Sequence, residues 1–478
     1  MRTAYSVETV RAAEQRLMAR VPEGALMQRA AAGLAVTCAQ LLGRVYGSRV
    51  VLLVGSGDNG GDALYAGARL ARRGAGVTAV LLAAERAHAG GLDALLRAGG
   101  RTVSAGDAEV ALLRADLVLD GIVGIGGRGG LRPDAARLAG LASESGGIVV
   151  AVDLPSGVEA DSGEVRGAAV RADVTVTFGT HKPGLLIDPA REYAGAVRLV
   201  DIGLGAELPD EPEVEALQHV DVARLLPLPG AGSDKYRRGV VGIAAGSGRY
   251  PGAAVLAVAG ALRGGAGAVR YVGPASDAVI ARFPEVLVSE GGPLKAGRVQ
   301  AWVVGPGGGD DASVVADVVT ADVPVLIDAD GLRLADPDAV RGRGAPTLMT
   351  PHAGEAAALL GVSRGEVEGA RLESVRELAG RYGATVLLKG ATTLVADSGG
   401  GVVRVNSTGT GWLATAGSGD VLSGLAGSLL AAGLSAFDAG SVGAYLHGLA
   451  GRLAADGAPV GAHDVAEAVR VAWRDVRD

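Results

Sequence analysis

The chain has 478 residues, more than one ordinary hydrophobic core accommodates, so two domains are expected. Apolar residues make up 49% of it, and the 78 glycines interrupt apolar runs, which indicates turns and close backbone–ligand approaches rather than disorder. A net charge of −7 excludes a nucleic-acid-binding protein that works by bulk positive charge. The single cysteine, Cys38, excludes an intrachain disulfide and a multi-cysteine metal site.

The beginning of the chain has no pattern of a targeting signal. Charged residues from Arg2 to Arg16 interrupt any apolar signal core. No uninterrupted apolar run reaches the roughly 20 residues that a membrane-spanning helix needs. We therefore expect a cytoplasmic protein that binds neither a membrane nor nucleic acid.

The first half has the pattern of a parallel α/β sheet. Short apolar, β-branched runs alternate with helical patterns, which is typical of a parallel sheet covered by helices on both faces. A helix is predicted over 61–72, and strands are predicted over 49–54, 77–82, 117–119, 148–152, 174–178 and 197–200.

An acidic, proline-bearing segment at 205–215 predicts a linker, after which the α/β pattern restarts. We place the domains at 1–212 and 213–478. The expected fold class is α/β, with a Rossmann-like three-layer α/β/α domain first. In the second half, strands are predicted over 240–245, 269–272, 301–304, 323–327 and 385–388, and helices over 252–263, 371–382 and 438–455.

The segment from Gly55 to Asp62 is a glycine loop between a predicted strand and a helix, a context that binds phosphates or dinucleotides. Asp58 and Asp62 disfavour a plain phosphate site, because like charges repel, and favour a cation or a polar ring. Asp120 and Asp153 also follow predicted strands, and ligands of open parallel sheets bind at the carboxyl ends of strands. Alternatively, these aspartates are turn formers or helix caps.

These motifs resemble the NAD(P)H-hydrate epimerase family over most of residues 1–205. The family has Asn-Asn-Gly-Gly-Asp where this chain has Asp58-Asn-Gly-Gly-Asp62, and the resemblance extends to Asp120 and Asp153-Leu-Pro-Ser-Gly157. It implies Asp153 as the acid–base group at C6 of the nicotinamide ring. It also implies a potassium ion on oxygen ligands suited to a hard cation, from Asn59, Asp120 and Ser156. The implied binding residues for the hydrated nucleotide are Asp58, Asn59, Gly60, Gly61, Asp62, Gly124, Ile125, Gly126, Gly127, Arg128, Gly129, Gly130 and Asp153.

The second half ends several predicted strands in polar or glycine loops. A glycine loop that opens a helix binds anions, so Asp420, after Ala416-Gly-Ser-Gly, is either a helix N-cap or a base beside a bound phosphate. Taken singly, His352 is interpreted as a structural histidine and Lys389 as a solvated surface charge. Asp328 and Asp330 are interpreted as ordinary turn residues. Their combination favours one shared nucleotide site.

Pro351–Glu355, Lys389–Thr393 and Ala416–Asp420 resemble the ADP/ATP-dependent NAD(P)H-hydrate dehydratase family, over about 225–475. The resemblance implies a ribokinase-like α/β/α sandwich, Mg2+ with ADP as co-substrate, and Asp420 as the catalytic base that accepts the C6 hydroxyl proton. The implied contacts with the hydrated nucleotide are Ala253, Gly307, His352 and Asp420. The implied adenine-nucleotide residues are Lys389, Gly390, Ala391, Thr392, Thr393 and Gly419.

Together the halves resemble the bifunctional NAD(P)H-hydrate repair enzymes. The resemblance implies epimerisation of the R and S hydrates at C6 and dehydration of the S form to NAD(P)H, while ADP becomes AMP and phosphate. The expected partners are NADHX or NADPHX and ADP, in a homo-oligomer. One alternative is a ribokinase-like kinase of a small vitamin or sugar alcohol, against which the epimerase-like half argues. The other is a catalytically inactive N-terminal binding module, against which Asn59, Asp120, Asp153 and Ser156 argue.

Overall fold

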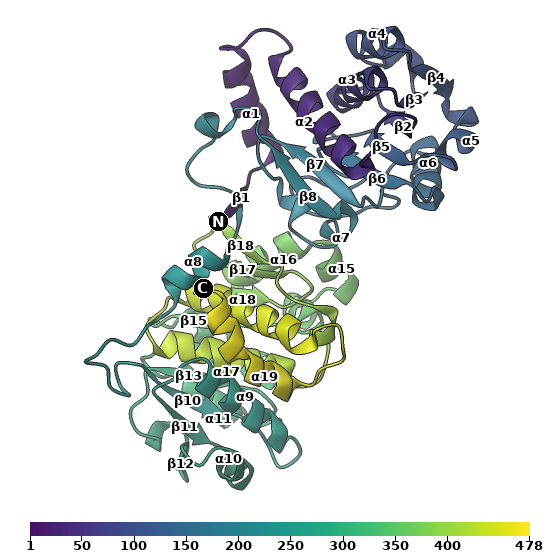
Figure 1. Cartoon of the computed structure of the whole chain (residues 1–478). Coiled ribbons are helices and arrows are strands. Elements are labelled where there is room, and N and C mark those ends of the chain that lie inside the picture. The colour runs from purple at the N-terminus through teal and green to yellow at the C-terminus, as the bar shows by residue number, and fades with distance from the viewer. The chain divides into compact units, whose positions relative to one another are not determined.

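The computed structural model describes residues 1–478 as two compact units (Figure 1). The N-terminal unit is Thr3–Glu213 and the C-terminal unit is Val214–Asp478. Met1–Arg2 group with the C-terminal unit, whereas the sequence analysis assigns them to the first domain.

The N-terminal unit alternates strands with helices along the chain. Its strands are β2 (Arg49–Val54), β3 (Gly76–Leu81), β4 (Arg101–Ser104), β5 (Leu117–Gly121), β6 (Ile148–Val152), β7 (Val174–Phe178) and β8 (Ala196–Val200). Its helices are α1 (Val7–Met18), α2 (Ala25–Leu42), α3 (Asp58–Arg72), α4 (Ala89–Arg97), α5 (Glu109–Leu112), α6 (Pro133–Glu144) and α7 (Arg191–Ala194).

The strands of this unit form one parallel sheet in the order β4-β3-β2-β5-β6-β7-β8. Successive side chains of a strand point to opposite faces. Accordingly Val50 and Leu52 pack with residues of α2 and α3, and Val51 and Leu53 pack with residues of α5 and α6. The unit is the three-layer, Rossmann-like α/β/α domain that the sequence predicts.

The C-terminal unit has more and shorter strands. They are β9 (Val214–Ala216), β10 (Val240–Ala244), β11 (Ala268–Val272), β12 (Leu287–Ser289), β13 (Ala301–Val304), β14 (Val325–Ile327), β15 (Thr347–Met349), β16 (Thr385–Leu388), β17 (Thr393–Ala396) and β18 (Val403–Asn406). Its helices are α8 (His219–Leu225), α9 (Pro251–Arg263), α10 (Ser276–Arg282), α11 (Ala312–Val319), α12 (Asp330–Leu334), α13 (Pro337–Arg341), α14 (Ala353–Leu360), α15 (Arg364–Gly369), α16 (Arg371–Tyr382), α17 (Ser418–Ala431), α18 (Ala436–Ala455) and α19 (Ala462–Asp475).

The second sheet has the order β1-β9-β18-β17-β16-β15-β14-β13-β10-β11-β12, where β1 is Arg2–Ala4. From β16 to β12 neighbouring strands are parallel, and β17 is antiparallel to both of its neighbours. One face is covered by α9, α17, α18 and α19 (Figure 1), while α11 and α16 pack against β13 and β16. This unit is an α/β/α sandwich, as predicted.

Helices α9 and α17 pack closely because glycines lie where they cross. A Cβ added to Gly424 of α17 would lie 1.8 Å from the carbonyl oxygen of Ala257, and one added to Gly260 of α9 would lie 2.1 Å from that of Val421. No side chain larger than hydrogen fits at either position without a backbone shift. The glycines therefore fix the position of α17, whose first turn carries Asp420.

Two predicted loops are the first turns of helices. Helix α3 begins at Asp58, with Gly57 at the N-cap, so Asp58–Asp62 is helical. Helix α17 begins at Ser418, with Gly417 at the N-cap at φ +88°, so Asp420 is not the N-cap. Glycine at these N-caps needs no capping side chain, and acidic residues in the first turn complement the positive end of the helix dipole.

Helix α2 is long and apolar enough to cross a membrane by length and composition, although Gln28, Arg29 and Gln40 interrupt its apolar run. Its residues Ala30, Leu34 and Cys38 are buried in the core of the N-terminal unit. The helix packs there against α3, the arrangement of a core helix.

Candidate functional site

The first candidate site lies at the carboxyl ends of β5 and β6. The buried carboxylate of Asp120 accepts hydrogen bonds from the Ser156 hydroxyl (2.7 Å) and the Ser156 backbone N–H (2.8 Å). Burial raises the pKa of Asp120 to about 6, although these hydrogen bonds oppose the shift. Asn59 lies against the neighbouring segment, since a Cβ on Gly124 would come within 2.9 Å of its Oδ1. Its Nδ2 is buried without a hydrogen-bond partner.

Asp153 is held by a buried lysine. The Lys182 Nζ donates to Asp153 Oδ1, to Thr177 Oγ1 (3.0 Å) and to the Phe178 carbonyl (3.1 Å), and its side chain is 1% exposed. The Thr177 hydroxyl and the Phe178 N–H also donate to Asp153 Oδ1. The three hydrogen bonds that Asp153 accepts all reach Oδ1, which leaves Oδ2 available to a ligand.

Several carboxylates lie near this single amine. Burial raises the pKa of Asp62 well above its ordinary value, and the charges of Asp153, Asp58 and Glu14 raise it further. Burial also raises the pKa of Glu14, which the charge of Lys182 opposes. This excess of acids disfavours a bare phosphate and favours a cation or a neutral polar group.

The glycine loop 124–130 lies only in part at this site. Gly124 adjoins Asn59, as described above. The Gly129 N–H instead donates to the Glu159 carboxylate (2.7 Å), and Gly130 packs against the carbonyl of Arg166. Arg128 is exposed. The structure thus brings the beginning of the loop to the Asp120 group and holds its end on another segment.

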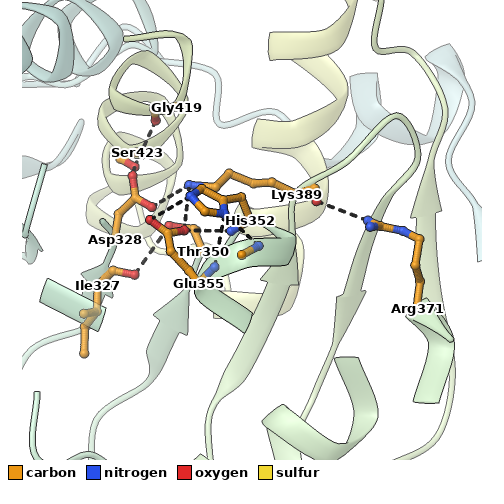
Figure 2. Close-up of polar contacts among 10 residues, drawn as sticks. Ile327, Asp328, Thr350, His352, Glu355, Arg371, Lys389, Gly419 and Ser423 are labelled. Atoms are coloured by element: carbon orange, nitrogen blue, oxygen red, sulfur yellow. Dashed lines mark hydrogen bonds and ion pairs between the residues drawn. The ribbon is translucent and has the colours of Figure 1, made fainter. Parts of the chain in front are cut away.

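The second candidate site lies at the carboxyl ends of β14, β15 and β16 (Figure 2). The Lys389 Nζ donates to Asp328 Oδ1 at 2.7 Å, and the Ser423 hydroxyl donates to Asp328 Oδ2 at 2.6 Å. Glu355 lies 3.8 Å from the same Nζ. Burial disfavours the charge of Lys389, but the charges of Asp328 and Glu355 outweigh it and raise the pKa of the amine. Lys389 is therefore a fixed cation and not a solvated surface charge.

Asp420 lies beside this cluster, in the first turn of α17. Burial raises its pKa to about 7, the charges of Asp328 and Asp330 add to the shift, and the charge of Lys389 opposes it. A carboxyl group with a pKa near neutrality is suited to general base catalysis. The free N–H groups of the same helical turn are suited to a phosphate.

His352 has a structural role and also lines a cavity. It is the N-cap of α14, where its Nδ1 accepts hydrogen bonds from the N–H groups of Gly354 (3.0 Å) and Glu355 (3.1 Å). The ring also lines a cavity of about 450 Å³ together with Asp330 and Glu355. That volume lies within the range of small-molecule sites, roughly 300–1,000 Å³.

Gly307, which follows β13, contacts Ala253 in the first turn of α9. A Cβ on Gly307 would lie 2.6 Å from the Cβ of Ala253, and the glycine has φ +59°. This close contact explains why the position takes glycine.

A buried arginine holds the loop that begins at Lys389. The Arg371 guanidinium donates to the carbonyls of Leu388 (3.2 Å), Lys389 (3.2 Å) and Thr392 (2.9 Å). Figure 2 shows the contact between Arg371 and Lys389. Thr392 is buried, so its side chain is turned from solvent. A Cβ on Gly419 would lie 3.6 Å from the Lys389 Nζ, so this loop faces the first turn of α17.

Sequence reasoning missed Lys182, Ser423 and Arg371. Lys182 follows the predicted strand 174–178 by a few residues, and a lysine just beyond a buried strand is a signal that could have found it. Arg371 and Ser423 lie within helices, and nothing local distinguishes them from ordinary helix residues.

A further buried histidine was also missed. His447 of α18 is buried, its Nε2 lacks a hydrogen-bond partner, and burial lowers its pKa to about 4 against a hydrogen bond to the Ser418 backbone. It therefore stays neutral beside the turn that carries Asp420.

Both sites contain strained backbone. Asp153 has φ +66° and Ala329, between Asp328 and Asp330, has φ +49°. Non-glycine residues adopt this region at a cost of roughly 1–3 kcal/mol and cluster at functional sites. In each site the strained residue follows a strand: Asp153 comes directly after β6, and Ala329 comes two residues after β14.

The comparisons with known proteins follow the same division. Residues 241–470 match the family model described as NAD(P)H-hydrate dehydratase, and residues 23–184 match that of the YjeF-related protein N-terminus. The chain is 50% identical over 464 residues to the bifunctional NAD(P)H-hydrate repair enzyme Nnr of Mycobacterium leprae, covering 95% of this chain and 94% of that one. It is 38% identical over 512 residues to the enzyme of the same name from Corynebacterium glutamicum, covering 90% and 87%.

A solved structure resembles the C-terminal unit. The ADP/ATP-dependent NAD(P)H-hydrate dehydratase from Bacillus subtilis, co-crystallised with ATP and Mg2+, is 29% identical with a TM-score of 0.51, covering 55% of this chain and 99% of that one. A ribokinase-like superfamily protein from Enterococcus faecalis, 21% identical with a TM-score of 0.50, shares the fold. The C-terminal unit thus has a ribokinase-like fold. The whole chain belongs to the family of bifunctional NAD(P)H-hydrate repair enzymes.

Proposed function

We propose that the C-terminal unit dehydrates the S form of NAD(P)H hydrate with ADP, and that the N-terminal unit interconverts its R and S forms. The observation that carries the proposal is Asp420, a carboxyl group with a pKa of about 7 in the first turn of α17, beside the Lys389–Asp328 pair. The family membership supports the substrate, and the B. subtilis neighbour supports an adenine nucleotide.

Asp420 acts as the base in the dehydration. The C6 hydroxyl of the hydrate is a poor leaving group, so it first takes a phosphoryl group from ADP, giving AMP, while Asp420 accepts the hydroxyl proton. The C6–O bond then breaks with phosphate as leaving group, driven by the ring-nitrogen lone pair, and loss of a proton from C5 forms the C5=C6 double bond of NAD(P)H. Lys389 and the N–H groups of Gly419 and its neighbours offset the charge of the transferred group.

The nucleotide residues surround this chemistry. Lys389, Gly390, Ala391, Thr392, Thr393 and Gly419 are proposed to hold the adenine nucleotide, and Ala253, Gly307, His352 and Asp420 the hydrated nucleotide. Magnesium is proposed to arrive with the nucleotide, because Mg2+ is commonly held by substrate phosphates and one or two carboxylates. The chain has no group of three or more His, Cys, Asp or Glu side chains arranged as a metal site, which fits such shared binding.

In the N-terminal unit, Asp153 is proposed to exchange the proton that accompanies epimerisation at C6. Its Oδ1 is saturated by Lys182, Thr177 and the Phe178 N–H, so Oδ2 is the oxygen that faces the reaction. Asp58–Asp62 and the loop 124–130 are proposed to bind the nucleotide.

A potassium ion fits the Asp120 group. Asp120, Ser156 and Asn59 offer a carboxylate, a hydroxyl and an amide, which are ligands that a hard cation prefers. No basic side chain bonds to Asp120, so its negative charge is available to a cation. Bound there, the ion would supply a fixed positive charge that helps to hold an anionic nucleotide.

The alternatives are not favoured. A ribokinase-like kinase of a vitamin or sugar alcohol does not explain why the chain resembles bifunctional repair enzymes over most of both its units. An inactive N-terminal module does not explain the Asp153–Lys182 pair and its strained backbone.

The products of ADP turnover test the proposal. Purified chain with ADP, Mg2+ and NADH hydrate is expected to form AMP, phosphate and NADH in equal amounts, which chromatography and absorbance measure. A stable phosphorylated product with no NADH would instead identify a kinase. AMP release without hydrate would show that the hydroxyl is not the acceptor.

A further inference from the structure

A second cavity of the C-terminal unit is lined by arginines. Its volume is about 330 Å³, which lies within the range of small-molecule sites, roughly 300–1,000 Å³. The lining includes Trp473, Pro227 and Leu228, and no acidic residue. Its six arginines are Arg237, Arg238, Arg263, Arg470, Arg474 and Arg477. Such a concentration is unusual in a chain whose net charge is −7.

Three of these arginines have partners within the protein. Arg263 pairs with Glu467 at 2.8 Å, Arg238 donates to the carbonyl of Gly265 at 3.2 Å, and Arg237 donates to that of Gly232 at 3.0 Å. Cations near the carbonyl ends of helices are stabilising in themselves. These three therefore need no ligand to explain them.

The side chains of the other three form no hydrogen bond or ion pair. Arg470, Arg474 and Arg477 are exposed and follow the spacing i, i+4, i+7, so they project from one side of the α19 segment. Like charges at such spacing repel each other. Two acids adjoin these arginines in the chain: Asp475 lies 3.1 Å from His219 instead, and Asp478 forms no ion pair with them. An anion is the group that would offset this charge.

The cavity lies at the opposite edge of the sheet from Asp420. Some of its lining residues precede β10 and others lie at or just after the end of α9. Ala432, which follows α17, also lines it. Asp420 is at the other end of α17. This helix has 14 residues and is therefore about 21 Å long, at 1.5 Å per residue. The arginine cavity is therefore distinct from the catalytic site, and one rigid helix connects the two.

We propose that this cavity binds a polyphosphate-bearing nucleotide, with the phosphates on Arg470, Arg474 and Arg477 and the base against Trp473. Guanidinium groups bind phosphates through paired hydrogen bonds. An indole offers an apolar face on which an aromatic base stacks. Bulk nucleic acid fits less well, because the chain as a whole is acidic and would repel a long polyanion.

Calorimetric titration of the full chain with ATP tests the site. The wild-type chain is expected to bind two equivalents, one at the catalytic site and one in the arginine cavity. Arg474→Ser/Arg477→Ser is expected to lose the second equivalent and keep the first, with unchanged dehydratase activity. Lys295→Ser/Arg298→Ser removes two exposed cations elsewhere in the same unit and is expected to keep both. Inorganic tripolyphosphate is expected to bind the cavity more weakly than ATP, because it lacks a base.

Three results would overturn the proposal. One is a single equivalent of ATP in the wild-type chain. Another is retention of both equivalents in Arg474→Ser/Arg477→Ser, or equal losses in the control variant. The third is a change in the oligomeric mass of Arg474→Ser/Arg477→Ser, measured by sedimentation, while both equivalents of ATP still bind. That result would show that this face is a contact between copies of the chain. The milder Arg477→Ser is expected to weaken the second site severalfold, and it serves if the double variant folds poorly.

Discussion

Asp420 and Lys389 belong to a polar cluster in which each charge affects the protonation of the other. Asp328 bonds to Lys389 and Ser423 and is almost fully buried, so its charge raises the pKa of Asp420 as well as that of Lys389. The result is a fixed cation beside a carboxyl group that can exchange a proton near neutral pH. Phosphoryl transfer needs both.

Replacement of Asp420 tests its role as the base. We expect Asp420→Asn to lower the dehydratase rate about 10²–10⁴-fold, the usual contribution of a general base. The rate is measured by the absorbance of NADH formed from the hydrate with ADP. Asp322→Asn, an exposed acid of the same unit, is the control and should retain full activity. Activity of Asp420→Asn within a few-fold of wild type would show that another group takes the proton.

The pH dependence follows from the direction of the pKa shift. Asp420 must be ionised to accept a proton, so kcat/KM for the hydrate should fall as pH drops through about 7. The charge of Asp330 raises that pKa, so Asp330→Asn should move the acid limb to lower pH. Profiles of both proteins between pH 5.5 and 8.5 measure this. An identical limb in the two, or none in either, would contradict it.

The residues at strand ends could be predicted, and their supporting partners could not. Asp120, Asp153, Asp328 and Lys389 each lie in or directly after a strand that the sequence marks clearly. Lys182 bonds to Asp153 across 29 residues of sequence, and such partners depend on tertiary structure. The structural interpretation of His352 holds, since it is the N-cap of α14, and it also lines the cavity.

At the scale of elements, the position of α17 decides where Asp420 lies. Gly260 and Gly424 allow α9 and α17 to approach until backbone meets backbone. The sequence alone does not show that these two glycines contact the opposite helix, because α9 and α17 are more than 150 residues apart in the chain.

Replacement of Gly424 tests this packing. A Cβ at this position would overlap the backbone of Ala257, so we expect Gly424→Ala to destabilise the C-terminal unit by about 1–3 kcal/mol, the usual cost of overpacking. Gly380 of α16 has open space around it, so Gly380→Ala should be stabilising by about 0.5–1 kcal/mol. Calorimetric unfolding measures both. A Gly424→Ala protein as stable as wild type would show that the helices can separate at little cost.

Several elements could be predicted from the sequence with their bounds, and some of the shortest strands could not be predicted at all. Strands 49–54, 148–152 and 174–178 and helix 371–382 have the predicted bounds. Strands β9, β12 and β15 have three residues each, too few for a period to show. Strand β14 also has three residues but could be predicted, because it lies in the longer run 323–327. The first turns of α3 and α17 are rich in glycine, so their composition predicts loops although they are helical.

At the scale of the whole molecule, the two units carry complementary sites. In the N-terminal unit, several carboxylates surround the buried Lys182. In the C-terminal unit, Lys389 lies among carboxylates beside the first turn of α17. The homo-oligomer and the cytoplasmic location expected from the sequence stay predictions. In the proposed function the two activities complement each other. The dehydratase uses only the S form, and the epimerase converts the R form into it.

Conversion of a mixture of the R and S forms of NADH hydrate tests the central claim most directly. With ADP, K+ and Mg2+, the wild-type chain should convert the whole mixture to NADH. Asp153→Asn should convert the S form at the wild-type rate and leave the R form to its slow spontaneous epimerisation, as chiral chromatography of the remaining hydrate would show. Wild-type conversion that stops when the S form is exhausted, or an Asp153→Asn protein that still converts both forms rapidly, would contradict the account.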